Sequence, residues 1–164
     1  MSLYLLTLIA PLVLLLGAGF AFSRRGPRPS FVLGALEAAS LVALCGAIGA
    51  AVWLGLAGAA STALVGPAGF ALTVRLDVVG AAMLVLVTFI GWIVLRYAVT
   101  YLDGEARQGA FMGWLAATLA TVLVFVQAGD LITLTAAWIA TSLCLHRLLL
   151  FYATRPQAQR AVAY

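Results

Sequence analysis

The sequence predicts an all-α, polytopic membrane protein whose 164 residues form one integral membrane domain, residues 1–164. Hydrophobic residues make up 65% of the chain and charged residues 9%, and the mean hydropathy is +1.16. A helix needs about 20 mainly apolar residues to cross a hydrocarbon core roughly 30 Å thick. The chain therefore has room for about five transmembrane helices. We expect them near residues 2–22, 31–56, 78–101, 111–127 and 131–152.

The first of these runs should stay in the mature protein. It lacks a basic segment at its start and is longer than the apolar region of a signal peptide. The stretch from Ser23 to Ser30 that follows contains three arginines and two prolines. Because these residues resist membrane burial and end helices, we expect a cytoplasmic loop here.

The second run carries small residues at every fourth position: Ala35, Ala39, Ala43, Ala47, Ala51 and Gly55. Such a ridge lets another helix approach closely, since packing drives helix association in lipid. Glu37 lies near the start of this run, where the positive end of the helix dipole favours a carboxylate. Two interpretations of Glu37 stay open: an acid at headgroup level, or an acid that faces a partner or handles protons.

Residues 58–74 are rich in Gly and Ala and predict an outside loop. The alternating pattern from Phe70 to Asp77 is compatible with extended backbone. Arg75 and Asp77 stand where the third helix begins, and the aspartate can accept bonds from the free amides of the first turn. Residues two positions apart do not share a helix face, so no local salt bridge is expected between them.

The third run ends with Arg96, Tyr97 and Tyr101, an expected interfacial anchor. The mixed-charge segment 102–109 predicts a turn between antiparallel helices. After the fourth run, Gly129 suits a helix end and Asp130 the N-cap of the next helix.

The arginines predict the orientation. The chain has no lysine, and eight of its nine arginines fall on one predicted side: Arg24, Arg25, Arg28, Arg96, Arg107, Arg147, Arg155 and Arg160. Arg75 alone falls on the other side. The positive-inside rule then places the N-terminus outside and the C-terminus in the cytoplasm. Basic residues confined to short connections also argue against a nucleic-acid surface.

The fifth run carries the candidate chemistry. On a helical wheel Thr135, Trp138, Ser142 and His146 fall within a sector of about 80°. Ser142 and His146 are four positions apart, so a contact between hydroxyl and imidazole is feasible. Histidine is the side chain whose unperturbed pKa lies near neutrality, and His146 is the only one in the chain. Thr135, Ser142 and His146 are therefore candidates for a proton or cation path.

A purely structural explanation stays open for the same residues. His146 could be satisfied by water or by neighbouring backbone near the helix end. Arg147 points away from the polar face and can reach the headgroups. The two cysteines, Cys45 and Cys144, lie on different runs without metal-ligand spacing, and we expect both to pack as small apolar residues. No metal site, catalytic triad, phosphate loop or dinucleotide motif is predicted.

Three stretches carry a resemblance to a known family. They are Arg75 and Asp77 in the pattern R-x-D, IGWIVLRYAVTYLDGE at residues 90–105, and VQAGDLITLTAAWIATSLCLHRLLLFY at residues 126–152. Over about half of its length the chain resembles the antiporter-like, proton-conducting membrane subunits related to NADH dehydrogenase subunit 5. The ending from Trp138 to Pro156 looks most like the DabB family, the membrane subunits of two-component inorganic-carbon transporters.

This resemblance implies the N-terminal part of an antiporter-like fold of about fourteen helices with two inverted repeats. The respiratory members have a glutamate directly after the tryptophan of the fifth helix, whereas this chain has Ile139 after Trp138. The remaining helices are expected on another chain, or the sequence is a truncated product or fragment.

The function implied by the resemblance is a transport subunit rather than an enzyme, in the bacterial inner membrane. It would conduct protons or another cation and drive bicarbonate or carbon dioxide uptake by a DabA-like zinc partner. No cofactor is expected on this chain, because the zinc would belong to that partner. Two alternatives stay open: a proton-translocating subunit of a respiratory or hydrogenase complex, and a non-conducting scaffold that uses the alanine ridge and the arginines to bind partners.

Overall fold

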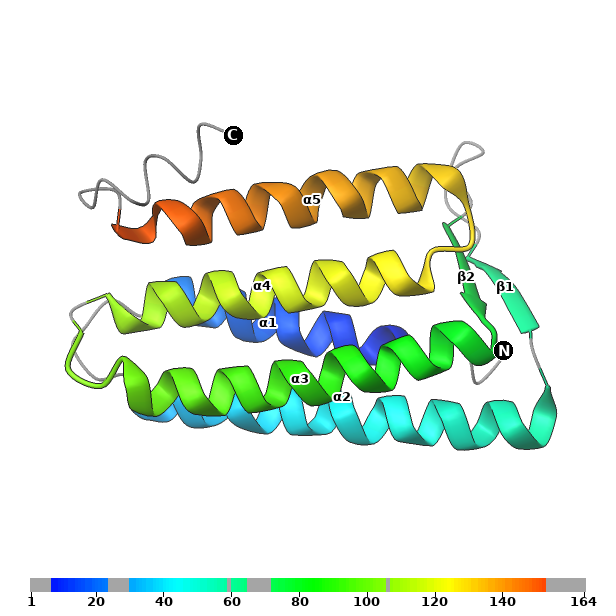
Figure 1. Cartoon of the computed structure of the whole chain (residues 1–164), viewed down its shortest axis with the longest axis horizontal. Coiled ribbons are helices and arrows are strands. Elements are labelled where there is room, and N and C mark those ends of the chain that lie inside the picture. Colours follow the sequence, from blue (N-terminus) through cyan, green and yellow to red (C-terminus); the bar gives the residue numbers. More distant parts are fainter. Residues whose placement is uncertain (1–6, 24–29, 59, 65–71, 106, 153–164) are drawn as a thin grey trace.

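The apolar runs form a bundle of antiparallel helices, and a hairpin lies in the connection between the second and third of the α-helices (Figure 1). The computed structural model describes residues 7–23, 30–58, 60–64, 72–105 and 107–152. Within these residues the α-helices are α1 (Ile9–Ser23), α2 (Ser30–Ala57), α3 (Val78–Tyr101), α4 (Gln108–Gln127) and α5 (Leu131–Leu149). A 3-10 turn, η3 (Leu150–Tyr152), extends α5. The predominantly α-helical fold is confirmed.

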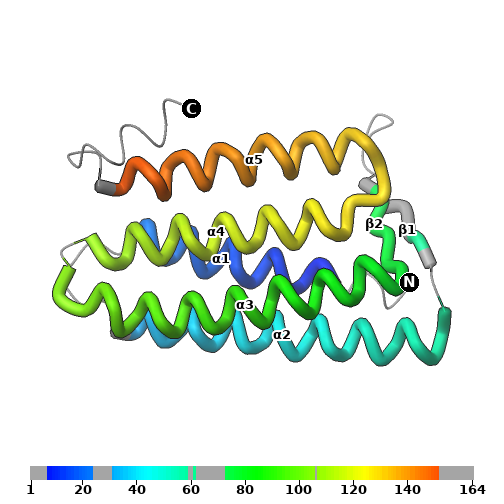
Figure 2. Tube along the Cα trace, viewed as in Figure 1, coloured from blue at the N-terminus to red at the C-terminus, as the bar shows by residue number. Residues whose placement is uncertain are grey.

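The helices run along the long dimension of the molecule (Figure 2). The α3–α4 turn lies at one end, and the α4–α5 junction lies at the other beside a small hairpin. Helices α1 to α4 pack around a shared core, whereas α5 packs chiefly on α4, at the edge of the bundle. One side of α5 is therefore left without a neighbour in the described part of the chain.

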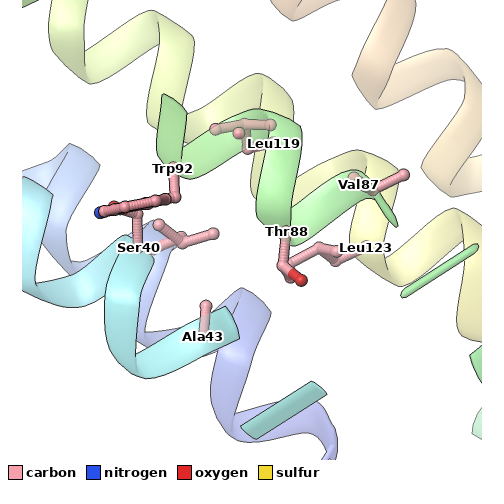
Figure 3. A pocket seen from close by; sticks show the side chains of 9 residues that line it. Ser40, Ala43, Val87, Thr88, Trp92, Leu119 and Leu123 are labelled. Atoms are coloured by element: carbon pink, nitrogen blue, oxygen red, sulfur yellow. The ribbon is translucent and has the colours of Figure 1, made fainter. Parts of the chain in front are cut away.

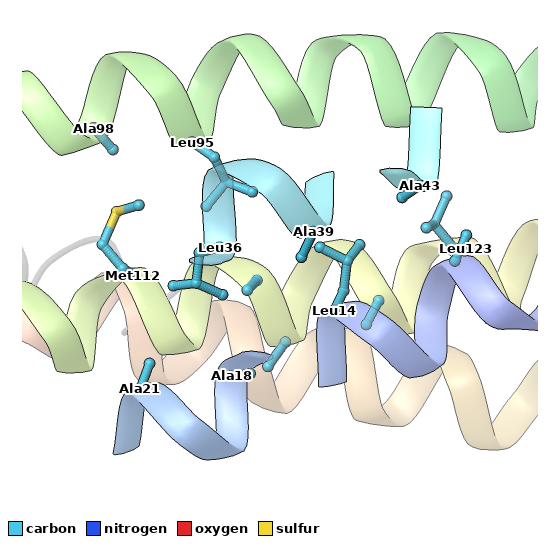
Figure 4. Close-up of a cluster of buried hydrophobic side chains, with 14 of the residues drawn as sticks. Leu14, Ala18, Ala21, Leu36, Ala39, Ala43, Leu95, Ala98, Met112 and Leu123 are labelled. Atoms are coloured by element: carbon cyan, nitrogen blue, oxygen red, sulfur yellow. The ribbon is translucent and has the colours of Figure 1, made fainter. Parts of the chain in front are cut away.

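Small side chains let the four helices of the core approach closely. Ala39, Ala43 and Ala47 of the predicted ridge are buried, whereas Gly55 at its end is exposed. Figure 4 shows Ala39 and Ala43 among larger side chains such as Leu14 and Leu123. The middle of the ridge thus packs within this chain, as expected for small residues in a membrane bundle.

The hairpin was only half predicted. Strand β2 (Leu72–Leu76) confirms the extended pattern, and it pairs antiparallel with β1 (Ala60–Leu64) with Ala60 opposite Leu76. Val74 and Leu76 are buried while Arg75 between them is exposed, the alternation that a strand imposes. The first strand was missed because its Ala-rich sequence has no alternation. Residues 65–71 lie outside the described part.

Helix α4 begins three residues earlier than predicted, at Gln108 instead of residue 111. The mixed charge of residues 102–109 predicts a turn, but the side chain of Gln108 is only 1% exposed and its amide donates to the carbonyl of Val99 (2.8 Å). The chain reverses before it at Gly104, whose φ of 89° suits glycine. The Gln108 side chain thus links α4 to α3.

Four helices, α2 to α5, are long and apolar enough to cross a membrane. Helix α1 has 15 described residues, a length of roughly 22 Å. Its predicted start at residue 2 lies outside the described residues, as do the arginines at 24, 25, 28, 155 and 160. The chain is an integral membrane protein.

The cysteines are both free thiols. Cys144 on α5 is half-buried and packs against the main core, as predicted. Cys45 on α2 is exposed instead, so its predicted packing role does not hold within the described part of the chain. Its position places it on the outer side of α2, away from the alanine ridge.

Candidate functional site

The polar face of α5 points away from the bundle. Thr135, Trp138, Ser142 and His146 are all exposed, and the only buried residue of α5 is Ala137. Ile139, which follows the tryptophan, is 53% exposed. The structure therefore keeps the predicted residues on one accessible face but brings no other described helix against it.

The hydroxyls on this face are satisfied by their own helix. Thr135 donates to the carbonyl of Leu131 (2.8 Å), and Ser142 donates to the carbonyl of Trp138 (3.0 Å). Bonds of this kind suit a hydroxyl in an apolar environment. The feasible contact between Ser142 and His146 is not formed, and the serine hydroxyl donates to its own backbone instead.

His146 differs from its neighbours on this face. No hydrogen bond or ion pair holds its imidazole within the described residues. A neutral imidazole can donate one hydrogen bond and accept another at the same time. A hydroxyl that donates to its own helix has no proton left for a second donor bond. The imidazole of His146 is thus available to a group outside the described residues.

Arg147 is also exposed, with no ion pair among the described residues. Its position one residue after His146 turns it about 100° around the helix. It therefore does not belong to the polar face, in agreement with the wheel.

The N-terminus of α5 is fixed by Asp130, which confirms its predicted capping role. Its carboxylate accepts bonds from the N–H of Thr133 (2.7 Å) and the hydroxyl of Thr133 (2.7 Å). It also accepts bonds from the N–H (3.1 Å) and hydroxyl (2.9 Å) of Thr73 on β2, 57 residues away in sequence. These donors, first the Thr133 N–H, hold the pKa of Asp130 well below its usual range.

Gly129 completes this junction directly after the end of α4. The C-cap of α4 is Ala128, and the N–H of Gly129 donates to the carbonyl of Thr73 (2.8 Å). A Cβ on Gly129 would lie 2.9 Å from that carbonyl oxygen. Glycine is therefore required for the close approach to β2.

The other end of α5 is held by Arg107, at the start of α4. Its Nη2 donates to the carbonyl of Phe151 (2.8 Å), and its guanidinium lies 4.6 Å from the centre of the Phe151 ring. Phe111 packs edge-on against the same ring. Sequence reasoning treated Arg107 only as a loop charge, because nothing local indicates a partner 44 residues away. Both ends of α5 are thus anchored while its polar face stays open.

A small cavity lies between the helices of the core. Ser40 and Thr88 line a cavity of about 10 Å³ between the helices (Figure 3). Ser40 donates to the carbonyl of Glu37 and Thr88 to that of Leu84. A cavity of this size holds about one water at most, so it cannot contain a chain of waters. These buried hydroxyls were missed because they sit singly in apolar runs.

The charged residues form two ion pairs in the described part of the chain. Arg75 and Asp77 approach to 3.3 Å, so the expectation of no local salt bridge was wrong. The reason is that Arg75 lies on β2 and Asp77 is extended, and residues two apart on extended backbone share a side. Asp77 also accepts the N–H of Gly80 (2.7 Å), as predicted for a cap.

The second pair joins two helices. Glu37 on α2 lies 3.8 Å from Nε of Arg96 on α3, and both side chains are partly exposed. A pair at this distance has modest strength. Glu37 therefore faces α3 within the chain.

Residues 64–112 match the N-terminal domain of chain 5 of NADH-ubiquinone oxidoreductase (complex I). The resemblance to the antiporter-like membrane subunits is confirmed. The chain is 42% identical over 95 residues to the probable inorganic carbon transporter subunit DabB2 of Halothiobacillus neapolitanus, covering 56% of this chain and 17% of that protein. It is 41% identical over 81 residues to the probable DabB subunit of Hydrogenovibrio crunogenus, covering 49% and 15%.

A respiratory relative is also similar. The chain is 32% identical over 82 residues to NADH-quinone oxidoreductase subunit L of Escherichia coli, covering 50% of this chain and 13% of that protein. The chain thus spans only a small part of the length of the relatives it matches.

Proposed function

We propose that this chain belongs to the membrane subunit of an inorganic-carbon transporter, which takes up bicarbonate or carbon dioxide with a DabA-like zinc partner. The observation that carries the proposal is the identity of 42% and 41% to two probable inorganic-carbon transporter subunits. Two respiratory subunits match at 31% and 32%. The subunit would conduct protons or another cation to drive uptake and would not itself be an enzyme.

Ile139 supports the same choice. The resemblance places a glutamate after the tryptophan in the respiratory subunits, and an isoleucine cannot carry a proton. A proton role on α5 therefore falls to His146, with Thr135 and Ser142 beside it. Their exposed face needs covering helices, which the much longer relatives have room to supply. By the same resemblance, the zinc would belong to the DabA-like partner.

The proposal includes a topology. The N-terminus would lie outside and the C-terminus in the cytoplasm of a bacterial inner membrane, following the arginine distribution. The end of the bundle with the hairpin would then face outward. The α3–α4 turn, with Arg107, would face the cytoplasm.

The test is growth of a carbonic-anhydrase-deficient host in air, with the full-length membrane subunit and its partner expressed together. His146→Ala should lower labelled bicarbonate uptake about a hundredfold or more, the usual range for loss of a positioned proton-transfer group. Leu145→Ala, at an exposed neighbouring position, is the matched control and should keep normal uptake. Normal uptake by a fully assembled His146→Ala complex would assign the histidine a structural role.

A proton-translocating respiratory subunit is the second candidate, favoured by the match to complex I chain 5. Copurification with iron-sulfur or quinone-binding proteins would support it over carbon uptake. A non-conducting scaffold is less well supported, because Ala39, Ala43 and Ala47 of the ridge are buried within this chain. In that case Arg147→Ala should weaken assembly with partners while His146→Ala does not.

A further inference from the structure

One surface of α3 carries hydrogen-bond donors without acceptors. A hollow of about 590 Å³ is lined by Trp92, Ile93, Arg96, Tyr97, Thr100 and Tyr101. These residues recur at helical spacing and so share one face of α3. Helices α3 and α5 lie on opposite sides of α4, so this surface is separate from the polar face of α5 (Figure 1).

The donors on this face have no acceptor at hydrogen-bond distance in the described part of the chain. Nε of Arg96 is 3.8 Å from the nearest carboxylate oxygen, on Glu37, which is too long for a hydrogen bond. The hydroxyls of Tyr97, Thr100 and Tyr101 donate to no group in the described part of the chain. Thr100 thus departs from Thr88 on the same helix, whose hydroxyl bonds its own backbone.

Contacts among the side chains of this face hold them in place without a ligand. The rings of Tyr97 and Tyr101 stack with centroids 5.5 Å apart, and the guanidinium of Arg96 lies 5.7 Å from the centre of the Trp92 ring. These contacts hold the side chains at low entropic cost to a ligand. Arginine suits a phosphate because its planar donors can bind two oxygens at once.

The position of the hollow along α3 favours a lipid phosphate over a free one. Helix α3 has 24 residues, roughly 36 Å, and a hydrocarbon core is roughly 30 Å thick. The excess of roughly 6 Å brings the last turn of α3 to headgroup level, where tyrosine and arginine are typical. The long side chain of Arg96 can extend from the preceding turn to the same level. Phe89 and Ile90, nearer the membrane centre, are 46% and 49% exposed and offer an apolar track for acyl chains.

We propose that this face binds the headgroup of an anionic phospholipid, with the phosphate on Arg96 and the hydroxyls of Tyr97, Thr100 and Tyr101. The acyl chains lie along Ile93 toward Phe89. The acidic residues Asp103 and Glu105 follow in the next turn, so the phosphate sits on their membrane side. This site is independent of the transported substrate.

Native mass spectrometry of the full chain in micelles with equal phosphatidylglycerol and phosphatidylcholine tests the proposal. We expect about fivefold preference for phosphatidylglycerol in the first bound lipid, roughly 1 kcal/mol. Arg96→Gln should lower this ratio about threefold or more. Arg75→Gln is the matched control, because Arg75 is 66% exposed and Arg96 65%, at opposite ends of the bundle. An unchanged ratio in Arg96→Gln, or an equal loss in Arg75→Gln, would overturn the site.

Two further variants guard against an effect of lost stability. Glu37→Gln also breaks the ion pair but leaves Arg96 free, so the preference should be kept or increased; a loss equal to that of Arg96→Gln would contradict the proposal. The double change Tyr97→Phe with Tyr101→Phe keeps the rings and should lower the preference about twofold. Inorganic phosphate added alone should not displace the lipid; displacement would show a free-phosphate site instead.

Discussion

At the scale of single residues, Asp130 does more than its position in the sequence suggests. A capping role could be predicted from an acid just before an apolar run. The bonds from Thr73 could not, because they depend on a hairpin that brings β2 beside the α4–α5 junction. One carboxylate therefore joins two parts of the chain that are 57 residues apart.

This geometry predicts a pH dependence. The pKa of Asp130 is lowered in the folded state, so its stabilising effect is present above about pH 4, its usual unfolded pKa, and is lost as the pH falls below that value. Thermal unfolding in detergent should show a falling melting temperature from about pH 5 to about pH 3. Asp130→Asn should melt several degrees lower at neutral pH and show a smaller fall. Parallel pH profiles for the two proteins would show that this carboxylate contributes little.

Gly129 gives a second prediction for the same junction. A Cβ at this position would meet the backbone oxygen of Thr73 at 2.9 Å, and backbone cannot move aside cheaply. Gly129→Ala should therefore destabilise the protein by about 1–3 kcal/mol, as overpacking does. Gly49→Ala is the matched control, since a Cβ there has no neighbour within 4 Å. Denaturant titrations followed by tryptophan fluorescence compare the two, and equal stability would contradict the close packing.

At the scale of elements, apolar runs predicted the helices well because length and hydropathy decide membrane insertion. The predicted start of α4 was wrong because the polar side chain of Gln108 is buried against α3, where it bonds the carbonyl of Val99. The first strand of the hairpin failed because pairing with β2, rather than its own composition, makes it extended. The residues that share the polar face of α5 were predicted correctly. The contact between Ser142 and His146 is not formed, and Ser142 donates to the backbone of its own helix.

The anchoring of α5 by Arg107 is testable at this scale. Arg107→Lys keeps the charge but cannot reproduce the planar fork that contacts Phe151. A charge-assisted bond contributes about 1.5–3 kcal/mol, so amides near Phe151 should exchange about tenfold faster or more. Arg147→Ala, which removes an exposed arginine without an ion pair in the described residues, should leave exchange unchanged. Equal exchange in all three proteins would mean that packing on α4 alone holds this end.

At the scale of the whole molecule, the structure separates a closed scaffold from an open face. Helices α1 to α4 bury their small residues against one another, and their central cavity of about 10 Å³ is too small for a water chain. Helix α5 is anchored at both ends yet has only Ala137 buried. The sequence could identify the residues of this face but not its exposure, which depends on how α5 sits on α4.

The proposed topology makes a final prediction about the two ends of the bundle. Ser61 lies in the hairpin and Asp103 in the α3–α4 turn, at opposite ends, and both are exposed. In a Cys45→Ala, Cys144→Ala background, Ser61→Cys should react with a membrane-impermeant maleimide in intact spheroplasts. Asp103→Cys should react only in inverted vesicles, because the proposed topology, which follows eight of the nine arginines, puts its end of the bundle in the cytoplasm. The reverse labelling pattern would invert the orientation and place His146, near the C-terminal end of α5, close to the outer surface instead of the cytoplasmic one.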